Sequence, residues 1–331
     1  MADTFKAFVV NKKEEGFTAT FENLTAADLP NDEVLIRVAY SSVNYKDGLA
    51  SIPEGKIVRS YPFVPGIDLA GVVAESRDPR FNVGDEVIAT SYEIGVSSYG
   101  GFSEYARVKA DWVVPLPSGL SLQEAMALGT AGFTAALAVY KLEYNGLHPQ
   151  NGPALVTGAS GGLGSIAISI LKNLGYTVAA STGKESEHAY LQELGADDIL
   201  SREETSAESN RSIEKERWAG SVDAVGGTTL AYLLRTARTG GSIASCGNTG
   251  GPNFSTTVFP FILRGVNLLG IDSVNCPMQL RRQIWEHLAS DYKPQHLLDL
   301  IGHEAPFTEL PQALAAILKG EVRGRTIIKV S

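Results

Sequence analysis

The sequence predicts an α/β fold in which a doubly wound parallel sheet is inserted into a β-rich domain. Short β-branched runs separated by turn signals fill the first 120 residues. Strands and helices then alternate up to about residue 295, a pattern typical of a parallel sheet covered by helices. The remaining residues return to the style of the first segment. We therefore expect a β-rich domain of residues 1–120 plus 296–331 and a nucleotide-binding domain of residues 121–295.

Composition narrows the class of protein. The chain has 331 residues, 44% of them hydrophobic and 20% charged, which is the balance of a soluble globular protein with two cores. A formal charge of −9 argues against nucleic acid or an anionic membrane as a partner. No uninterrupted apolar run reaches the roughly 18 residues of a membrane helix, and "MADTFKAFVV" lacks the features of a secretory signal. Because Cys246 and Cys276 cannot form a disulfide framework, we expect a cytoplasmic protein.

The β-rich segment contains five short runs that we expect to be strands, at residues 6–10, 33–40, 69–76, 85–90 and 104–117. Turn signals such as "PND" and "NVGD" separate them. Their regular spacing predicts a small barrel or sandwich.

The pattern changes at Ser121, which forms a capping box with Glu124 and starts a helix over residues 122–146. Alternating elements follow. Strands are expected at 153–158, 177–182, 197–200, 221–227, 240–247 and 267–273, and helices at 163–174, 184–194, 203–218, 228–238 and 278–290. The last segment predicts a strand and a helix within 303–321 and a final strand at 324–330.

The stretch "LVTGASGGLG" predicts a phosphate-binding turn. Its glycines are spaced Gly158-x-x-Gly161-Gly162-x-Gly164, directly after a short apolar run. Glycines permit a sharp turn from strand to helix and let backbone N–H groups reach a pyrophosphate at the helix N-terminus. Strand, loop, helix and second strand occur in that order, as a dinucleotide site requires.

The residues after the second predicted strand favour NADPH over NADH. An NAD site usually places Asp or Glu there, to bind the ribose 2′-hydroxyl. This chain instead has Ser181, Thr182 and Lys184, whose hydroxyls and ammonium group suit a 2′-phosphate. Arg202, after the third strand, is within reach of the same pocket. The alternative is that Lys184 and Arg202 are solvated surface residues.

Several further motifs identify a family resemblance. They are "NYKDGLA" (44–50), "PGIDLAG" (65–71), "GDEV" (84–87), "GGFSEYA" (100–106), "RWAGSVDAVGG" (217–227) and "LLGIDSV" (268–274). With the "GASGGLG" loop, they resemble the medium-chain dehydrogenase/reductase superfamily, and within it the YhdH/YhfP-type quinone oxidoreductases, a branch that also contains acryloyl-CoA reductases. The resemblance implies a GroES-like catalytic domain, a Rossmann domain and a nicotinamide in the cleft between them.

The resemblance also implies four groups of cofactor-binding residues, for the pyrophosphate, the 2′-phosphate, the nicotinamide ribose and the carboxamide. In that order they are Ser160, Gly161, Gly162 and Leu163; Ser181, Thr182 and Lys184; Cys246, Gly247 and Asn248; and Ile271, Asp272 and Ser273. The strand at 267–273 resembles the edge that pairs the sheets of family dimers, so we expect a homodimer.

Zinc is not expected. The zinc-dependent branch has a Cys near the position of Asn44 and a Gly-His-Glu motif where this chain has Gly66, Ile67 and Asp68. The scattered histidines offer no tetrahedral site either. Without zinc to stabilise an alkoxide, reduction of an activated double bond or a quinone is more natural than alcohol oxidation.

Two residues of the β-rich domain are candidates for catalysis. Tyr45 is placed to donate a hydrogen bond or proton to the developing oxyanion, and Asn44 to orient that anion or contact the cofactor. The alternatives are that Tyr45 walls the pocket and that Asn44 caps a helix. We expect Asp68 to be a buried structural carboxylate paired with Lys46.

Arg323 and Arg325 either bind an anionic substrate tail or make surface ion pairs. The sequence therefore predicts an NADPH-dependent reductase of quinones or α,β-unsaturated carbonyl compounds. The alternatives are an acryloyl-CoA reductase and a non-catalytic NADPH-binding protein. The expected partners are a small-molecule acceptor and a second copy of the chain, with no nucleic acid or membrane.

Overall fold

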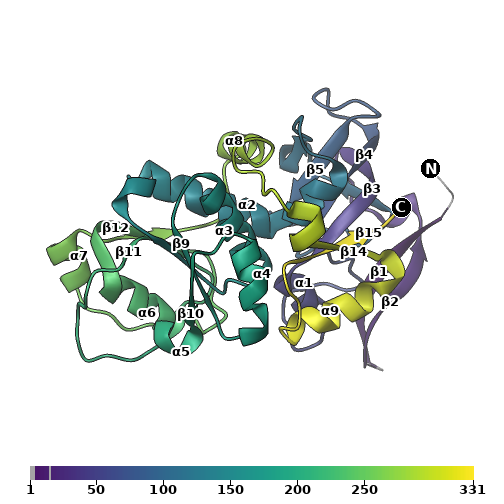
Figure 1. Ribbon diagram of the computed structural model, residues 1–331. Coiled ribbons are helices and arrows are strands. Elements are labelled where there is room, and N and C mark those ends of the chain that lie inside the picture. The colour runs from purple at the N-terminus through teal and green to yellow at the C-terminus, as the bar shows by residue number, and fades with distance from the viewer. Residues whose placement is uncertain (1–3, 15) are drawn as a thin grey trace. The chain divides into compact units, whose positions relative to one another are not determined.

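The computed structural model describes residues 4–14 and 16–331, which divide into two compact units (Figure 1). The first unit contains the chain up to Thr130, the segment Val274–Gln283 and the segment Gly302–Ser331. The second unit contains Ala131–Ser273 and Ile284–Ile301. The second unit therefore interrupts the first along the chain.

One boundary between the units follows Thr130, and another follows Ser273. The helix α2 (Leu122–Tyr144) begins in the first unit and changes direction at Gly129, whose backbone is non-helical (φ 52°, ψ −155°). The segment Val274–Gln283 belongs to the first unit because Arg281 donates to the carbonyl and hydroxyl of Thr90 at 3.3 and 3.2 Å. Neither contact is visible in the local sequence pattern.

The second unit is built on a six-stranded parallel sheet, which confirms the predicted doubly wound fold. Its strand order is β10-β9-β8-β11-β12-β13. The bounds are β8 (Ala154–Thr157), β9 (Val178–Thr182), β10 (Asp198–Ser201), β11 (Trp218–Asp223), β12 (Ala237–Ser245) and β13 (Asn267–Gly270). The order reverses between β8 and β11, and ligands of such sheets bind at the carboxyl ends of the strands beside this reversal.

Short helices connect these strands: α3 (Gly162–Asn173), α4 (His188–Glu193), α5 (Arg202–Thr205), α6 (Gly227–Thr236) and α7 (Phe259–Arg264). The apolar face of α3 is fully buried, including Ile166 and Ile170. The predicted helix over 203–218 is wrong, because only α5 forms and Trp218 already belongs to β11. The segment between them is charged and mostly exposed, so it offers little apolar surface to pack a helix against the sheet.

The first unit contains a β-rich core. A seven-stranded sheet has the order β14-β15-β3-β4-β5-β7, with β6 paired to β3, and a separate hairpin joins β1 and β2. The bounds are β1 (Phe5–Lys13), β2 (Gly16–Leu24), β3 (Val34–Val43), β4 (Asp68–Ser76), β5 (Glu86–Thr90), β6 (Tyr105–Val108), β7 (Val113–Pro115), β14 (Gly302–Pro306) and β15 (Arg325–Lys329). The strand β2 was not predicted, because its residues are mostly half-exposed or exposed.

Two helices pack together beside this sheet, α1 (Tyr45–Ala50) and α9 (Leu310–Leu318) (Figure 1). Gly48 permits their close approach, since a Cβ atom there would lie 2.9 Å from the side chains of Ile317 and Leu318. A further helix, α8 (Met278–Leu288), follows β13 along the chain. The helix α1 is short; Tyr45, one candidate catalytic residue, is its first residue, and Asn44, the other, directly precedes it.

The helix α2 has the length and composition of a membrane span, with 23 residues and a mean hydropathy of 1.3. The helix is not an uninterrupted apolar run, because Glu124 and Lys141 lie within it. In the structure, 78% of its most apolar window is buried inside the protein. The helix is therefore part of the protein core.

Candidate active site

The glycines of the predicted phosphate loop have separate structural roles. Gly158 ends β8 with a left-handed backbone (φ 60°), and its carbonyl accepts the N–H of Gly161 at 3.1 Å. Gly161 is the residue before α3. A Cβ atom on Gly164 would lie 2.5 Å from the Gly158 carbonyl oxygen, so the helix packs directly on the turn. The uneven glycine spacing thus produces an open turn at a helix N-terminus, where an anion is stabilised.

A pocket of about 190 Å³ lies at the carboxyl ends of the strands, beside this turn. It brings together four of the predicted cofactor residues, Ser160, Ser181, Thr182 and Arg202. The other described residues that line it are Gly158, Gly183, Thr205, Val225, Thr229, Thr249 and Gly250. None of these lining residues is an acid, and Arg202 is the cation among them.

The pocket is arranged for an anion. The Arg202 guanidinium lies against Gly183, where a Cβ atom would be only 2.8 Å from its Cζ and Nε atoms. Ser181 and Thr205 share a hydrogen bond of 2.6 Å between their hydroxyls, and Thr182 Oγ1 accepts the N–H of Lys184 at 3.1 Å. Lys184 is half-buried and is not among the lining residues. The pocket also includes Thr229 and Thr249, which sequence reasoning missed because they come from distant segments.

The residues predicted for the nicotinamide ribose follow β12. Cys246 donates its N–H and its Sγ–H to the carbonyl of Asp223, at 2.9 and 3.2 Å. Burial, reinforced by the charge of Asp223, raises the pKa of the Cys246 thiol, so it stays neutral and unreactive. The backbone at Gly247 approaches Ala224 closely, since a Cβ atom there would lie 2.3 Å from the Ala224 oxygen. Asn248 is exposed.

Asp223 is a buried carboxylate that sequence reasoning missed. It accepts hydrogen bonds from the Thr157 hydroxyl at 2.6 Å, from the Val225 N–H at 3.1 Å and from the Gly226 N–H at 3.0 Å. Burial raises its pKa, while these hydrogen bonds lower it. The carboxylate therefore ties together the ends of β8 and β11, which hold the turn and the pocket in place. The signal available in the sequence was an Asp at the end of an apolar strand, followed shortly by two glycines.

The residues predicted for the carboxamide follow β13. The N–H of Ile271 donates to the carbonyl of Ser245 at 3.1 Å, which continues the sheet past the strand end. Ser273 is buried, and its hydroxyl accepts from the Thr134 hydroxyl at 2.8 Å. Asp272 is exposed. None of these three residues lines the 190 Å³ pocket, so their role stays a prediction.

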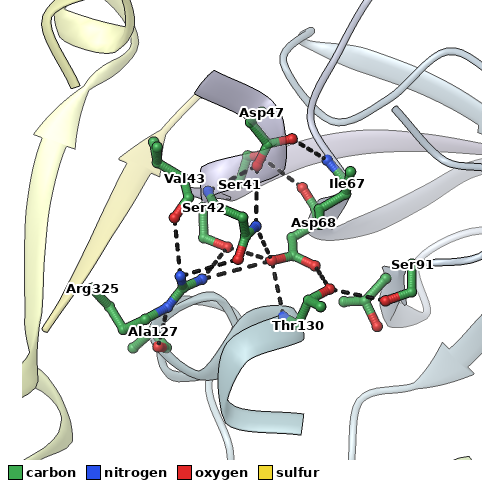
Figure 2. A network of polar contacts seen from close by, with 12 residues as sticks. Ser41, Ser42, Val43, Asp47, Ile67, Asp68, Ser91, Ala127, Thr130 and Arg325 are labelled. Atoms are coloured by element: carbon green, nitrogen blue, oxygen red, sulfur yellow. Dashed lines mark hydrogen bonds and ion pairs between the residues drawn. The ribbon is translucent and has the colours of Figure 1, made fainter. Parts of the chain in front are cut away.

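The first unit contains a buried polar network around Asp68 (Figure 2). The Asp68 side chain is 0% exposed and accepts the Ser42 hydroxyl at 2.7 Å and the Asn44 amide at 2.8 Å. Thr130 donates both its N–H, at 2.9 Å, and its hydroxyl, at 2.5 Å. The guanidinium of Arg325 lies 3.6 Å away as the counter-charge. Asp68 is thus a buried structural carboxylate as expected, but its partner is Arg325 and not Lys46.

Arg325 is enclosed by the protein. Its Nε donates to the Ala127 carbonyl at 3.2 Å, and its Nη1 donates to the Val43 carbonyl at 3.0 Å. Nη2 donates to the Ser42 hydroxyl at 2.8 Å. Burial lowers the pKa of the guanidinium, whereas the charges of Asp68 and of nearby Asp47 raise it.

The prediction that Arg325 binds a substrate tail or makes a surface ion pair is therefore corrected. Its side chain is 4% exposed, and each of its nitrogens already donates within the network. Arg323, two residues earlier, is exposed, so a role for it stays a prediction.

Asn44 connects the network to α1. Its amide Nδ2 donates to Asp68 at 2.8 Å and to Asp47 at 3.1 Å, and its Oδ1 accepts from Arg325 at 3.1 Å. Its backbone N–H donates to Asp47 Oδ2 at 2.8 Å, which caps the helix. Both amide hydrogens and the amide oxygen are thus engaged by charged side chains. The geometry favours the capping alternative for Asn44 over a direct bond to the acceptor.

Asp47 is the second buried carboxylate of the network. Burial, followed by repulsion from Asp68, raises its pKa to about 7, while hydrogen bonds from Ile67 and Asn44 oppose the rise. Tyr45 begins the same helix and keeps 54% of its side-chain surface exposed. A fixed helix start therefore presents an accessible phenol, and this arrangement suits a hydrogen-bond or proton donor.

Ser91 and Tyr92 extend the network toward the next loop. Both have left-handed backbones (φ 65° and 50°), which is unusual for residues other than glycine. The Ser91 hydroxyl lies 3.0 Å from that of Thr130. Tyr92 stacks on Trp112, with ring centroids 5.9 Å apart. No sequence signal indicated these two backbones.

No group of three or more His, Cys, Asp or Glu side chains within residues 4–14 and 16–331 is arranged to hold a metal ion. The oxygens of Asp47 and Asp68 already accept hydrogen bonds from protein donors. Zinc independence stays a prediction.

Comparison with known proteins covers the whole chain. Residues 30–118 match the family "Alcohol dehydrogenase GroES-like domain", and residues 162–291 match "Zinc-binding dehydrogenase". The chain is 53% identical to "Putative quinone oxidoreductase YhfP" of Bacillus subtilis, over 100% of both proteins. It is 51% identical to "Acrylyl-CoA reductase AcuI" of Ruegeria pomeroyi, over 99% of each.

Solved structures agree with this match. The Bacillus subtilis YhfP structure with NAD bound superposes with a TM-score of 0.97 at 53% identity, covering 99% of both chains. The Salmonella enterica YhdH structure in complex with NADP superposes with a TM-score of 0.95 at 46% identity, covering 98% of this chain and 100% of that one. Both units of the chain are therefore covered by these matches.

Proposed function

Since this chain belongs to the medium-chain dehydrogenase/reductase superfamily, in the YhdH/YhfP branch that includes the acrylyl-CoA reductases AcuI, we propose that it is an NADPH-dependent reductase. Its acceptor would be a quinone or an α,β-unsaturated carbonyl compound, reduced without zinc. The observation that carries this proposal is the acid-free pocket at the carboxyl ends of β8 and β9, with Arg202 and hydroxyls on its walls. Such a pocket suits a 2′-phosphate and would lack the carboxylate that binds the ribose of NADH.

The relatives support a nicotinamide cofactor but differ in which one they hold. The YhdH structure contains NADP, whereas the YhfP structure contains NAD. We propose NADPH for this chain because Ser181, Thr182 and Arg202 line a pocket whose chemistry suits a 2′-phosphate. Gly162 and Leu163 are the first two residues of α3, and their backbone N–H groups would hold the pyrophosphate.

The cofactor, when bound, supplies the hydride. Reduction of an enone or quinone leaves an oxyanion, which the protein must stabilise and protonate. We propose that the exposed phenol of Tyr45 does this, with its position set by Asn44. A Tyr45→Phe variant should lose turnover while keeping NADPH affinity. Unchanged turnover would assign the proton to water instead.

The acceptor is the least constrained part of the proposal. The relative at 53% identity is named a quinone oxidoreductase, and the relative at 51% is named an acrylyl-CoA reductase. An acyl-CoA acceptor carries phosphates and would need cations to bind them. Lys46, Lys56, Arg59 and Arg323 are the candidates that the first unit offers.

A panel of acceptors tests the function. The purified protein is mixed with NADPH and acryloyl-CoA, 1,4-benzoquinone or a simple enone, and loss of the reduced-nicotinamide absorbance is followed. We expect oxidation with at least one acceptor, and the ratio of kcat/KM values ranks them. Absence of oxidation with all three, combined with measurable NADPH binding, would favour a non-catalytic NADPH-binding protein.

We also propose that the protein is a cytoplasmic homodimer. The strand β13 forms one edge of the parallel sheet. Apolar side chains of α7 and β13 are exposed beside this edge, including Ile262 (67%), Leu263 (60%) and Leu268 (37%). Pairing of two such edges would cover them and complete the backbone hydrogen bonds. Light scattering of the purified protein measures the mass, and a monomer would contradict the proposal.

A further inference from the structure

We propose that Asp47 is a positioning residue: its ionised carboxylate fixes the first turn of α1 and thereby the location of the Tyr45 phenol. The inference rests on the proposed function, because that function is what assigns Tyr45 to the reaction. Asp47 would belong to the site without touching either the acceptor or the cofactor. The claim depends on the hydrogen bonds of one fully buried side chain.

The oxygens of Asp47 receive three N–H donors. Oδ1 accepts the backbone N–H of Ile67 at 2.9 Å. Oδ2 accepts the backbone N–H of Asn44 at 2.8 Å and its amide Nδ2 at 3.1 Å. Figure 2 shows the carboxylate directed at Ile67, above the Asp68 group. Asp47 thus links the residue before α1 to the residue before β4.

All three hydrogen-bonding neighbours donate, so the ionised carboxylate satisfies them with its acceptors alone. A proton on Oδ2 would displace one of its two N–H donors, and a proton on Oδ1 would need an acceptor that none of these three neighbours supplies. The other buried carboxylate, that of Asp68, already receives Ser42, Asn44 and Thr130. Protonation of Asp47 would therefore weaken its contacts to Asn44 and Ile67, because a neutral carboxyl accepts hydrogen bonds less strongly than a carboxylate.

The electrostatic surroundings place this event near neutral pH. Burial and the charge of Asp68, on β4, raise the pKa of Asp47 to about 7. Arg325, on β15, is the cation that faces the pair. The helix α9, which packs on α1, places the apolar side chains of Ile317 and Leu318 against Gly48, the residue after Asp47. Lys46 is the charged neighbour on α1 itself.

The pH dependence of folding stability distinguishes a positioning role of Asp47 from a stabilising one. The folded state holds the Asp47 proton more tightly than the unfolded state, whose pKa is near 3.8. This group alone therefore makes the folded protein less stable as the pH rises toward about 7. A carboxylate kept for stability would show the opposite sign. Activity should instead require the ionised form, so activity and this contribution to stability change in opposite directions with pH.

The test compares wild type with Asp47→Asn, using the acceptor that the panel identifies. For wild type, kcat/KM should fall about tenfold per pH unit below a pKa of about 7. Asp47→Asn should lower kcat about 10- to 100-fold through misplacement of the phenol and should remove this acidic limb. The Kd of NADPH should stay unchanged. Wild-type kcat/KM with an unaltered pH profile in the variant would overturn the inference.

Asp28→Asn is a matched control. Asp28 accepts the N–H of Thr25 with Oδ2 at 2.7 Å, three residues earlier in the chain, as Asp47 does with Asn44. It is exposed and lies in the first turn of the 3-10 helix Ala26–Asp28. Its replacement should leave kcat and the pH profile as in wild type. An equal loss of activity in both variants would also contradict a specific role for Asp47.

A second measurement needs neither a variant nor an acceptor. Hydrogen exchange of the wild-type backbone amides of Asn44 and Ile67, corrected for intrinsic rates, is compared below and above about pH 7. Protection should drop at the lower pH at these two amides and not at Thr25. Unchanged protection would refute the geometry directly. If no acceptor is reduced, the proposed function fails, but the exchange result still decides whether Asp47 holds α1.

Discussion

Replacement of Arg202 by Ala should weaken NADPH binding and leave NADH binding nearly unchanged. The guanidinium lies against Gly183, on the wall of the acid-free pocket. A hydrogen bond between a charged donor and a phosphate contributes about 1.5–3 kcal/mol. Because Arg202 is solvent-exposed, we expect a contribution at or below the lower end of this range, about 1–2 kcal/mol. That corresponds to a rise in the Kd of NADPH of about 5- to 30-fold.

The assay is titration of both nucleotides into wild type and variants by calorimetry at one low salt concentration, since exposed charges are screened by salt. Arg211→Ala is the control, because Arg211 is an exposed arginine that lines a different cavity of the same unit. Lys184→Glu shows whether the second cation contributes. Equal weakening of NADPH and NADH by Arg202→Ala, or no change in either, would refute the assignment of this pocket to the 2′-phosphate.

Three further outcomes follow from contacts already described. Arg325→Met leaves Asp68 and Asp47 buried without a counter-charge and should lower the free energy of unfolding of the first unit by about 3–5 kcal/mol, measured with urea. Gly164→Ala should cost about 1–3 kcal/mol and weaken NADPH binding, because the new Cβ would lie 2.5 Å from a carbonyl oxygen of the turn; unchanged affinity and thermal stability would contradict this. Cys246 should react with iodoacetamide far more slowly in the native protein than in denaturant, because burial raises the pKa of its thiol, and rapid native labelling would show that the thiol is accessible.

The nucleotide-binding unit was predictable because its signals are local. The apolar run of the first strand, the glycine turn and the following helix and strand lie within about 30 residues of each other. The sheet is parallel, as expected. The absence of an acid at the end of β9 was equally predictable, because Ser181 and Thr182 occupy that position. The predicted helix over 203–218 was wrong, because this segment has a helical composition but no apolar face that could pack against the sheet. Local propensity without a buried face does not determine structure.

The polar network was only partly predictable because its contacts join distant segments. Burial of Asp68 was expected, but its counter-charge was assigned to Lys46, a near neighbour in sequence. The actual partner, Arg325, comes from the last strand and donates to residues as far away as Val43. Arg323 and Arg325 are separated by one residue and look equivalent in the sequence, yet Arg323 is exposed and Arg325 is buried. Register within the sheet, which no local pattern contains, decides between them.

The energetics of this network indicate that it serves geometry more than stability. Two buried carboxylates, Asp47 and Asp68, face one buried guanidinium, and well-packed apolar residues in place of such a group are often neutral or stabilising. The raised pKa of Asp47 points the same way, because its ionised form opposes folding at neutral pH. What apolar residues could not supply is directional contact with both amide hydrogens and the amide oxygen of Asn44. That contact fixes Asn44, the residue directly before Tyr45, whose phenol is exposed in the candidate site. The position of this phenol is the best explanation for the free-energy cost of the network.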